Sequence, residues 1–398
     1  DCIRAGTDFE GLRLLRPASF QEIQSSVCFI HNIGRMGNSS IKFGKVNILV
    51  LQRYTINILP KLILYEENVI EKLSLDANKQ TDLFGILRAA DNSIRFGKVK
   101  RLELLNYSIN ILPKLKLHEE GDVEVLYLGA DETEHLSEIL RVADNSILVG
   151  KVKRLELFNY AISILPKLKL HKENEMEELH LSSDKEEYVS EAILGENNSI
   201  QLGKVRKLEL KLFAINVLPK LKLHEKNEME ELHLSAEKKE YVSEVICAEN
   251  NSIWLGKVNN LELELFAINI LPKLKLHGAN VMEEFSLSAD KEEYVSEAIR
   301  AKNSTIWLGK MKKLDLELFA INILPKLVLH EENEMEEFCL SAEKKEYVSE
   351  IIRAENNSIC LGKVNNLDLE LFAINILPKL KLHGANVMEE FSLSADKE

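Results

Sequence analysis

A Leu-Pro pair recurs every 53 residues, and this period constrains the fold more than any other feature of the sequence. A glycine followed by lysine keeps the same step, as a tight turn would require. A fixed period of this length is typical of stacked repeats, in which each copy buries its apolar surface against the next. The periodic prolines are Pro60, Pro113, Pro166, Pro219, Pro272, Pro325 and Pro378, and the glycines are Gly44, Gly97, Gly150, Gly203, Gly256, Gly309 and Gly362.

The period divides the chain into an N-terminal segment and seven copies. We expect residues 1–40 to form a cap, because an array needs a covered end and the segment shows the spacing of an amphipathic helix at Phe20, Ile23, Val27 and Ile30. The predicted copies are 41–93, 94–146, 147–199, 200–252, 253–305, 306–358 and 359–398, the last incomplete. Because the chain stops inside a copy, we expect the natural protein to continue.

Each copy contains two similar halves. In the copy 253–305, apolar residues and a proline follow one another with the spacing of a short strand and a turn, and the spacing of the first three recurs later in the copy. Leu261 and Leu263 alternate with Glu262 and Glu264, which predicts a strand with one buried and one solvent-facing side. The first set is Val258, Leu261, Leu263, Ile268, Leu271 and Pro272, and the second is Met282, Phe285 and Leu287.

The clearest helix signal lies in the second half of the copy. The segment from Glu292 to Arg300 has acidic residues in its first turn and an apolar face, and Ser288 or Asp290 is the expected N-cap. The preceding stretch 265–277, LFAINILPKLKLH, is compatible with a turn or with a strand. The sequence therefore predicts an α/β repeat.

The copies resemble the leucine-rich repeat family, whose pattern LxxLxLxxNxLxxLP is met by the first set above. In the second half, the family's asparagine position holds polar residues that we expect to bond backbone amides in its place. In the first half that position is aromatic, which predicts a column of rings. The polar residues are Asn78, Asp131, Asp184, Glu237, Asp290, Glu343 and Asp396, and the aromatic ones are Tyr54, Tyr107, Tyr160, Phe213, Phe266, Phe319 and Phe372.

The resemblance implies a leucine-rich-repeat-like solenoid of the α/β class, with a parallel sheet on the concave face and helices or turns on the convex face. Seven copies of about 50 residues are also compatible with a seven-bladed propeller, which is all-β. The helix signal at Glu292 to Arg300 favours the solenoid.

Charged residues precede the buried strand leucines, basic in the first halves and acidic in the second. Such rows would lie on neighbouring strands about 4.8 Å apart and could pair across the ladder. One interpretation is a solvated charge ladder, and the other is a surface for a charged protein partner. The candidate partner-binding residues are Lys100, Arg101, Lys153, Arg154, Arg206, Lys207, Glu177, Glu178, Glu230 and Glu231.

Histidine recurs at one position in six of the seven copies, with Tyr65 in its place in the first, and we expect a turn or surface role for this column. Neighbouring members would be about 10 Å apart, too far to share one zinc ion. His180 and His233 fall between the strand leucines and should point outward. The column comprises His118, His171, His224, His277, His330 and His383.

No motif for phosphate binding, nucleophilic catalysis or zinc occurs in the sequence, so we expect no catalytic, cofactor or metal site and no enzyme activity. The odd number of cysteines, five, predicts free thiols in a reducing, intracellular compartment. The net charge of −13 argues against nucleic-acid partners and anionic lipid, and no apolar run is long enough to span a membrane.

Together these features favour a non-catalytic scaffold that binds a protein partner through distributed contacts. Two alternatives remain open at this stage. The chain could be the recognition part of a larger adaptor or receptor whose effector domain lies beyond its ends, or a purely structural array.

Overall fold

The computed structural model describes residues 32, 35–42, 44–63, 68–117, 122–329 and 332–395. The chain divides into two compact units, Asp1–Asn174 and Glu175–Glu398. The amphipathic residues of the expected N-terminal cap, Phe20 to Ile30, lie outside the described residues. Within each unit, every strand pair that the structure describes is parallel.

The first unit contains a parallel sheet whose strands pair in the order in which they occur in the chain. Its long strands are β2 (Ile48–Gln52), β4 (Val69–Ala77), β6 (Lys98–Asn106), β8 (Asp122–Ala130) and β9 (Ile147–Asn159). Short strands form a second layer, as β1 (Ile41–Lys42) with β3 (Leu62–Ile63), β5 (Ile94–Arg95) with β7 (Leu115–Lys116), and β10 (Leu168–Leu170) with the start of β9.

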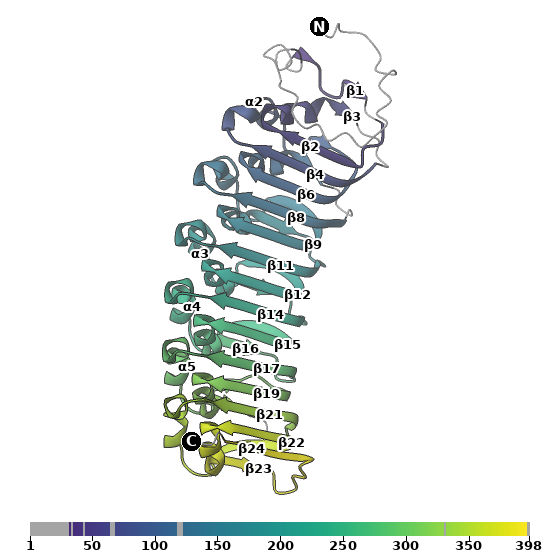
Figure 1. Cartoon of the computed structure of the whole chain (residues 1–398). Helices are drawn as coiled ribbons and strands as arrows, with labels where there is room; N and C mark the ends of the chain where they lie inside the picture. The colour runs from purple at the N-terminus through teal and green to yellow at the C-terminus, as the bar shows by residue number, and fades with distance from the viewer. Residues whose placement is uncertain are drawn as a thin grey trace. The chain divides into compact units, whose positions relative to one another are not determined.

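The second unit repeats this arrangement, and Figure 1 shows its long strands side by side with α3, α4 and α5 along one side. The long strands are β11 (Glu175–Ser183), β12 (Ile200–Leu212), β14 (Glu228–Ala236), β15 (Ile253–Leu265), β17 (Val281–Ala289), β19 (Lys310–Leu318), β21 (Glu334–Ala342), β22 (Ile359–Leu371) and β24 (Glu390–Ser394). The short strands are β13 (Leu221–Leu223), β16 (Leu274–Leu276), β18 (Ile306–Trp307), β20 (Leu327–Val328) and β23 (Leu380–Leu382).

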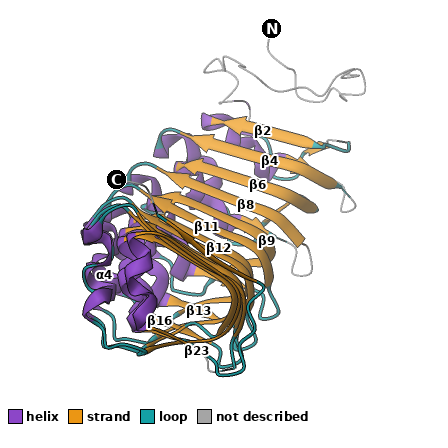
Figure 2. Cartoon of the chain, turned by 60° about the horizontal axis from the view of Figure 1, so that its bottom comes forward, coloured by secondary structure: helices purple, strands orange, loops and turns teal. Residues whose placement is uncertain are grey.

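The strands form where the alternation of apolar and charged residues predicted them. Leu261 and Leu263 of β15 and Phe285 of β17 are buried on the inner face, whereas Glu262 and Glu264 are exposed on the outer face. The short strands lie across the interior from the long strands, as Figure 2 shows for β13, β16 and β23. Each copy therefore encloses its leucines between two parallel layers.

Gly256 marks the corner at which β15 passes from the short layer into the main sheet. Residues before it pair with β16, and residues after it pair with β14. Its φ is +80°, and a Cβ there would lie 2.4 Å from the carbonyl oxygen of Asn227. Only glycine fits this conformation and this close approach without strain. The same left-handed φ recurs at Gly97, Gly150, Gly203, Gly309 and Gly362.

The ambiguous stretch resolves into a 3₁₀ helix followed by a short strand, seen in β16 after η10 (Phe266–Lys273). The predicted helix is present as a 3₁₀ turn, η11 (Glu292–Tyr294), and a short α-helix, α5 (Ser296–Arg300). The 3₁₀ helices that correspond to η10 are η1 (Arg53–Lys61), η3 (Tyr107–Lys114), η6 (Tyr160–Lys167), η8 (Phe213–Lys220), η12 (Phe319–Lys326) and η15 (Phe372–Lys379).

The second halves of the other copies carry similar short helices. In the first unit these are η2 (Gln80–Leu83), α2 (Phe84–Leu87), η4 (Thr133–Leu136) and η5 (Ile139–Arg141). In the second unit they are η7 (Glu186–Tyr188), α3 (Ser190–Leu194), η9 (Lys239–Val242), α4 (Ser243–Cys247), η13 (Lys345–Val348) and η14 (Ile351–Arg353).

The expected N-cap is wrong. Ser288 lies in β17, and Asp290 is exposed in the turn that follows. The cap comes instead from Asn269 in the preceding half-copy, whose Oδ1 accepts the backbone N–H groups of Glu297 at 2.8 Å and Ala298 at 3.4 Å. A buried side chain thus satisfies the orphan donors that open the short helix. The equivalent contacts are made by Asn57, Asn110, Asn216 and Asn322.

A second set of asparagines, buried in five copies, lies at the turn before the second-half strand of every copy except the second, which has Gly121 there. The Oδ1 of Asn280 accepts the N–H of Val258 at 2.8 Å, and its amide donates to the carbonyl of Leu308 at 2.8 Å. Asn68, Asn174, Asn227, Asn333 and Asn386 make the first of these bonds in their own copies. The amide positions expected from the family pattern, Asn78 to Glu343, are exposed instead, and Asp396 lies outside the described residues.

Several aromatic residues of the first halves pack edge-on against a tyrosine in the second half of their own copy, as Phe266 does on Tyr294 with ring centroids 4.8 Å apart. Phe213 with Tyr241 and Phe319 with Tyr347 repeat the contact. The parallel pairing does not fit the propeller alternative, because propeller blades are antiparallel.

Candidate interaction surface

The outer face of the second unit's sheet carries a line of polar side chains, one from each long strand, which we term the central row. The pairing register places His180 opposite Glu209, Glu209 opposite His233, and His233 opposite Glu262. Both histidines point outward, as predicted. From β11 to β24 the central row is His180, Glu209, His233, Glu262, Ser286, Asp315, Cys339, Asp368 and Ser392.

Two residues further along each strand lies an outer row, in which serine alternates with a charged residue. It runs Ser182, Lys211, Ser235, Glu264, Ser288, Glu317, Ser341, Glu370 and Ser394. The two rows together hold seven acidic side chains and one lysine, Lys211, the acids being Glu209, Glu262, Asp315, Asp368, Glu264, Glu317 and Glu370. This part of the sheet is therefore strongly anionic.

Burial and neighbouring charges on this face raise the pKa values of two side chains, Asp315 and Cys339. Burial raises the pKa of Asp315 to about 6, and the nearby charges of Glu317, Glu284 and Glu370 add to that rise. Burial likewise raises the pKa of the Cys339 thiol to about 11, with further contributions from Asp315 and Asp368. Cys339 is thus held protonated at neutral pH.

The corresponding face of the first unit is different. Its central row is Val50, Ser74, Glu103, Tyr127 and Glu156, and its outer row is Gln52, Asp76, Leu105, Gly129 and Phe158. The rings of Tyr127 and Phe158 lie 5.1 Å apart, and the Arg101 guanidinium lies 5.9 Å from the Tyr127 centroid. This face therefore presents aromatic and apolar groups beside a few ion pairs.

Glu103 illustrates that difference. It accepts a hydrogen bond from Arg101 at 2.6 Å and forms an ion pair with Lys72 at 2.8 Å. Burial acts to raise the pKa of Glu103, but the hydrogen bonds from Lys72 and Arg101 outweigh it and the net shift is downward.

The candidate partner-binding residues form ion pairs near the beginning of the long strands. Lys100 pairs with Glu71 at 2.9 Å and Lys207 pairs with Glu231 at 3.1 Å, while Arg206 pairs with Glu230. The hydrogen bond to Glu231 raises the pKa of Lys207. The predicted pairing across the ladder is therefore present for these residues.

The remaining candidates occupy the equivalent positions in other copies. Arg101 reaches Glu103, as described above, and Arg154 lies opposite Val125 in the register. Lys153 lies in β9, and Glu177 is exposed in β11. Glu178 lies with His180 and Glu209, close enough for their ligand atoms to fall within 4.8 Å of one another.

The recurring histidine column has the turn role that was predicted. The Nδ1 of His277 accepts the N–H of Ala279 at 3.1 Å, and the His277 carbonyl accepts the N–H of Asn280. His171, His224 and His383 accept the same type of bond. His118 and His330 lie outside the described residues. Of the cysteines, Cys247, Cys339 and Cys360 are free, as expected.

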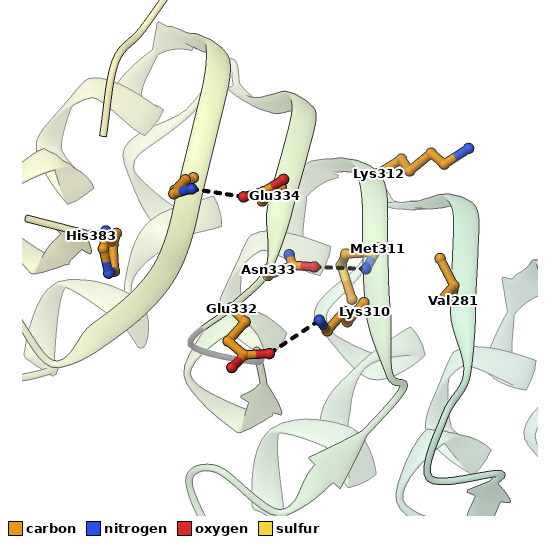
Figure 3. A pocket seen from close by; sticks show the side chains of 9 residues that line it. Val281, Lys310, Met311, Lys312, Glu332, Asn333, Glu334 and His383 are labelled. Atoms are coloured by element: carbon orange, nitrogen blue, oxygen red, sulfur yellow. Dashed lines mark hydrogen bonds and ion pairs between the residues drawn. The ribbon is translucent and has the colours of Figure 1, made fainter. Parts of the chain in front are cut away.

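A cavity of about 680 Å³ opens beside residues of β17, β19, β21 and β22 (Figure 3). Its charged groups pair with one another or with adjacent residues. Lys310 reaches Glu332 at 3.4 Å, and Lys363 reaches Glu334 at 2.7 Å. Because these side chains neutralise one another, we do not assign the cavity a ligand.

Comparisons with protein-family models, with curated proteins and with solved structures find no match to this chain. Within the described part of the chain, no helix combines the length and the apolar character needed to cross a membrane. The resemblance to leucine-rich repeats therefore stays a prediction that rests on the residue pattern.

Sequence reasoning selected the charged pairs near the strand starts and passed over the central and outer rows. The available signal was the alternation around each pair of strand leucines, which already placed Glu262 and Glu264 outward. It does not reveal that residues from separate half-copies meet, because that depends on the register between strands.

Proposed function

We propose that the chain is a non-catalytic scaffold of the leucine-rich-repeat type that binds a protein partner through the outer face of the second unit's sheet. The observation that carries the proposal is the excess of acidic side chains in the central and outer rows. The partner segment is accordingly basic and rich in lysine or arginine, because like-signed charges on this face find few partners within the sheet.

Geometry suggests how such a segment would lie. Glu264, Glu317 and Glu370 stand on every second strand of the sheet, so neighbouring members are about 10 Å apart. A polyproline II helix advances about 9.3 Å in three residues. A peptide with lysine at every third position would therefore align its charges with these three carboxylates.

The partner's affinity would be the sum of many modest contacts, as is usual for repeat scaffolds. The free thiols of Cys247, Cys339 and Cys360 support a reducing, intracellular compartment. The alternative that the chain is the recognition part of a larger adaptor or receptor uses the same surface and is compatible with the same partner chemistry.

Calorimetry with two synthetic peptides tests the proposal. One carries lysine at every third residue between proline and serine, and the other has the same composition with its lysines clustered. We expect the spaced peptide to bind several-fold more tightly, with an affinity that falls as salt is added.

The decisive variant is Glu264→Lys/Glu317→Lys/Glu370→Lys, which should abolish binding of the spaced peptide. Its matched control is Glu196→Lys/Glu249→Lys/Glu355→Lys, which makes the same change in net charge at exposed turn residues. The copy between those of Glu249 and Glu355 already carries lysine at this position, Lys302. Equal loss of binding in both variants would leave only a general charge effect and would refute the assigned surface.

A further inference from the structure

Three side chains on neighbouring strands of the second unit converge in the manner of metal ligands. His233 of β14 lies opposite Glu262 of β15, and Glu264 follows two residues later on the same outer face. One ligand atom from each of the three lies within 4.8 Å of the other two. The groups come from separate half-copies, so the register alone brings them together.

The separation of the imidazole and the carboxylate is informative. His233 Nε2 lies 3.6 Å from Glu264 Oε2, which is longer than an N–H···O hydrogen bond of about 2.7–3.2 Å. Two ligands bound tetrahedrally to one zinc ion at about 2.0–2.2 Å stand about 3.3–3.6 Å apart. The distance therefore suits a shared cation better than a direct hydrogen bond.

His233 Nε2 is also buried and has no hydrogen-bond partner among the described residues. A buried nitrogen without a partner is destabilising, and a metal ion in the space between it and the carboxylates would remove that cost. The one lysine of the central and outer rows, Lys211, contacts Glu209. No contact that the structure describes joins Lys211 to Glu262 or Glu264.

We propose that His233, Glu262 and Glu264 bind a divalent transition-metal ion, with Zn²⁺ the preferred ion. One imidazole nitrogen and two carboxylates form a three-ligand set that leaves a fourth position to water or to a group of a bound partner. Two negative charges balance the charge of the ion. The site does not depend on the proposed basic partner, so either proposal can fail without the other.

The other copies provide internal comparisons at the same three positions. In the preceding copy the set is His180, Glu209 and Lys211, and the Lys211 ammonium lies 2.5 Å from the Glu209 carboxylate. A fixed ammonium at that point competes with a metal ion for the carboxylate. Although Glu178 lies near His180 and Glu209, we expect this copy to bind Zn²⁺ much more weakly.

The following copies lack the imidazole. Ser286 stands in place of His233 beside Asp315 and Glu317, and Cys339 stands there beside Asp368 and Glu370. Serine is a poor zinc ligand. Cys339, Asp368 and Glu370 do not form one of the clusters in which ligand atoms of the described residues lie within 4.8 Å of one another. The repeats thus show that the fold accepts serine or cysteine at the position of His233 and lysine at the position of Glu264.

The test is titration of the EDTA-stripped full chain with Zn²⁺ in competition with a chromogenic chelator. Substitution of Co²⁺ reports the coordination geometry through its visible absorption. We expect one tight site in the unaltered chain, with the intense d–d bands of tetrahedral cobalt. Two variants copy residues from neighbouring repeats, His233→Ser from Ser286 and Glu264→Lys from Lys211, and each should weaken that site at least ~50-fold.

The matched control is His180→Ser, which makes the same change one copy earlier and should weaken the tight site by less than ~3-fold. Ser286→His should create a second cobalt-binding site with Asp315 and Glu317. Circular dichroism should show unchanged secondary structure in all four variants. Equal affinity of the unaltered chain and His233→Ser, or a greater loss in His180→Ser than in His233→Ser, would overturn the assignment.

Discussion

The two units build their outer sheet faces on the same scaffold and give them opposite character. In the first unit, Glu103 is neutralised by Lys72 and Arg101, and Tyr127 and Phe158 supply aromatic surface. In the second unit, burial and the neighbouring carboxylates together raise the pKa of Asp315 to about 6. The difference teaches that outward positions vary freely because they take no part in the packing of the leucines.

The largest expected effect comes from breaking the shared scaffold at a corner. Gly256→Ala would place a Cβ 2.4 Å from the carbonyl oxygen of Asn227 at a φ of +80°. We expect the free energy of unfolding to fall by about 3 kcal/mol or more. Gly278→Ala is the control, because nothing lies within 4 Å of its Cβ position. Similar denaturation midpoints for the two variants would contradict the role of the corner.

The buried asparagines test how much the polar contacts that open the short helices stabilise the second unit. Asn269→Ala removes the acceptor of two backbone N–H groups and the donor to the Glu293 carbonyl. We expect a loss of about 2–3 kcal/mol by urea denaturation. Asn375 occupies the same position in the last copy, where it is exposed and bonds only locally to the Phe372 carbonyl. Asn375→Ala should therefore change stability by less than about 0.5 kcal/mol.

Glu103→Gln tests the neutralised face of the first unit. The ionised form of Glu103 is favoured in the folded state, so its stabilising contribution is present above the ordinary pKa of glutamate and is lost as pH falls through the lowered value. We expect the variant to lose about 1 kcal/mol at pH 7 and much less near pH 3. A loss that does not depend on pH would argue against the charge-assisted bonds.

Asp315→Asn tests the acidic face of the second unit. Its effect on stability should be opposite in sign to that of Glu103→Gln. Protonated Asp315 is favoured in the folded state, so the associated stability is present at low pH and is lost as pH rises through about 6. The variant should therefore gain stability relative to the unaltered chain between pH 5 and pH 7. The gain should stay below about 1 kcal/mol, because solvent screens a half-buried carboxylate. If the stability of the variant and of the unaltered chain changed with pH in the same way, the raised pKa of Asp315 would be excluded.

The smallest effect concerns a strained residue at the end of the first-half strands. Leu265 has a φ of +56°, and the first unit places Asn106 and Asn159 at this position. Asparagine tolerates positive φ better than leucine. We expect Leu265→Asn to raise stability by about 0.5 kcal/mol in thermal unfolding. The reverse change, Asn106→Leu, should be destabilising, in part because it removes the bond to Asp76.

The sequence supported those features that depend on neighbours within one half-copy. The alternation of Leu261 and Leu263 with glutamates predicted the strand, and the segment from Glu292 to Arg300 predicted the short helix. The helix cap was missed because Asn269 reaches its partners, Glu297 and Ala298, from 28 and 29 residues away. No local pattern marks such a contact.

The candidate site was predicted only in part for the same reason. The positions of His180 and His233 between strand leucines indicated that both face outward. That His233 meets Glu262 and Glu264 depends on the pairing of β14 with β15, and an isolated sequence does not specify that register. His233, Glu262 and Glu264 therefore match no sequence motif, because metal-binding motifs record only ligands at short, fixed spacings along the chain.

The corner glycines and the constant register have a consequence for how such a chain varies in length. If residues 253–305 were deleted, β14 would meet β19 with the same type of partners that it now finds in β15, including a lysine opposite Glu228. Recombination between neighbouring repeats in the encoding DNA can therefore remove or add a whole repeat without creating a new kind of junction. Each such event would shorten or lengthen the binding face by two strands.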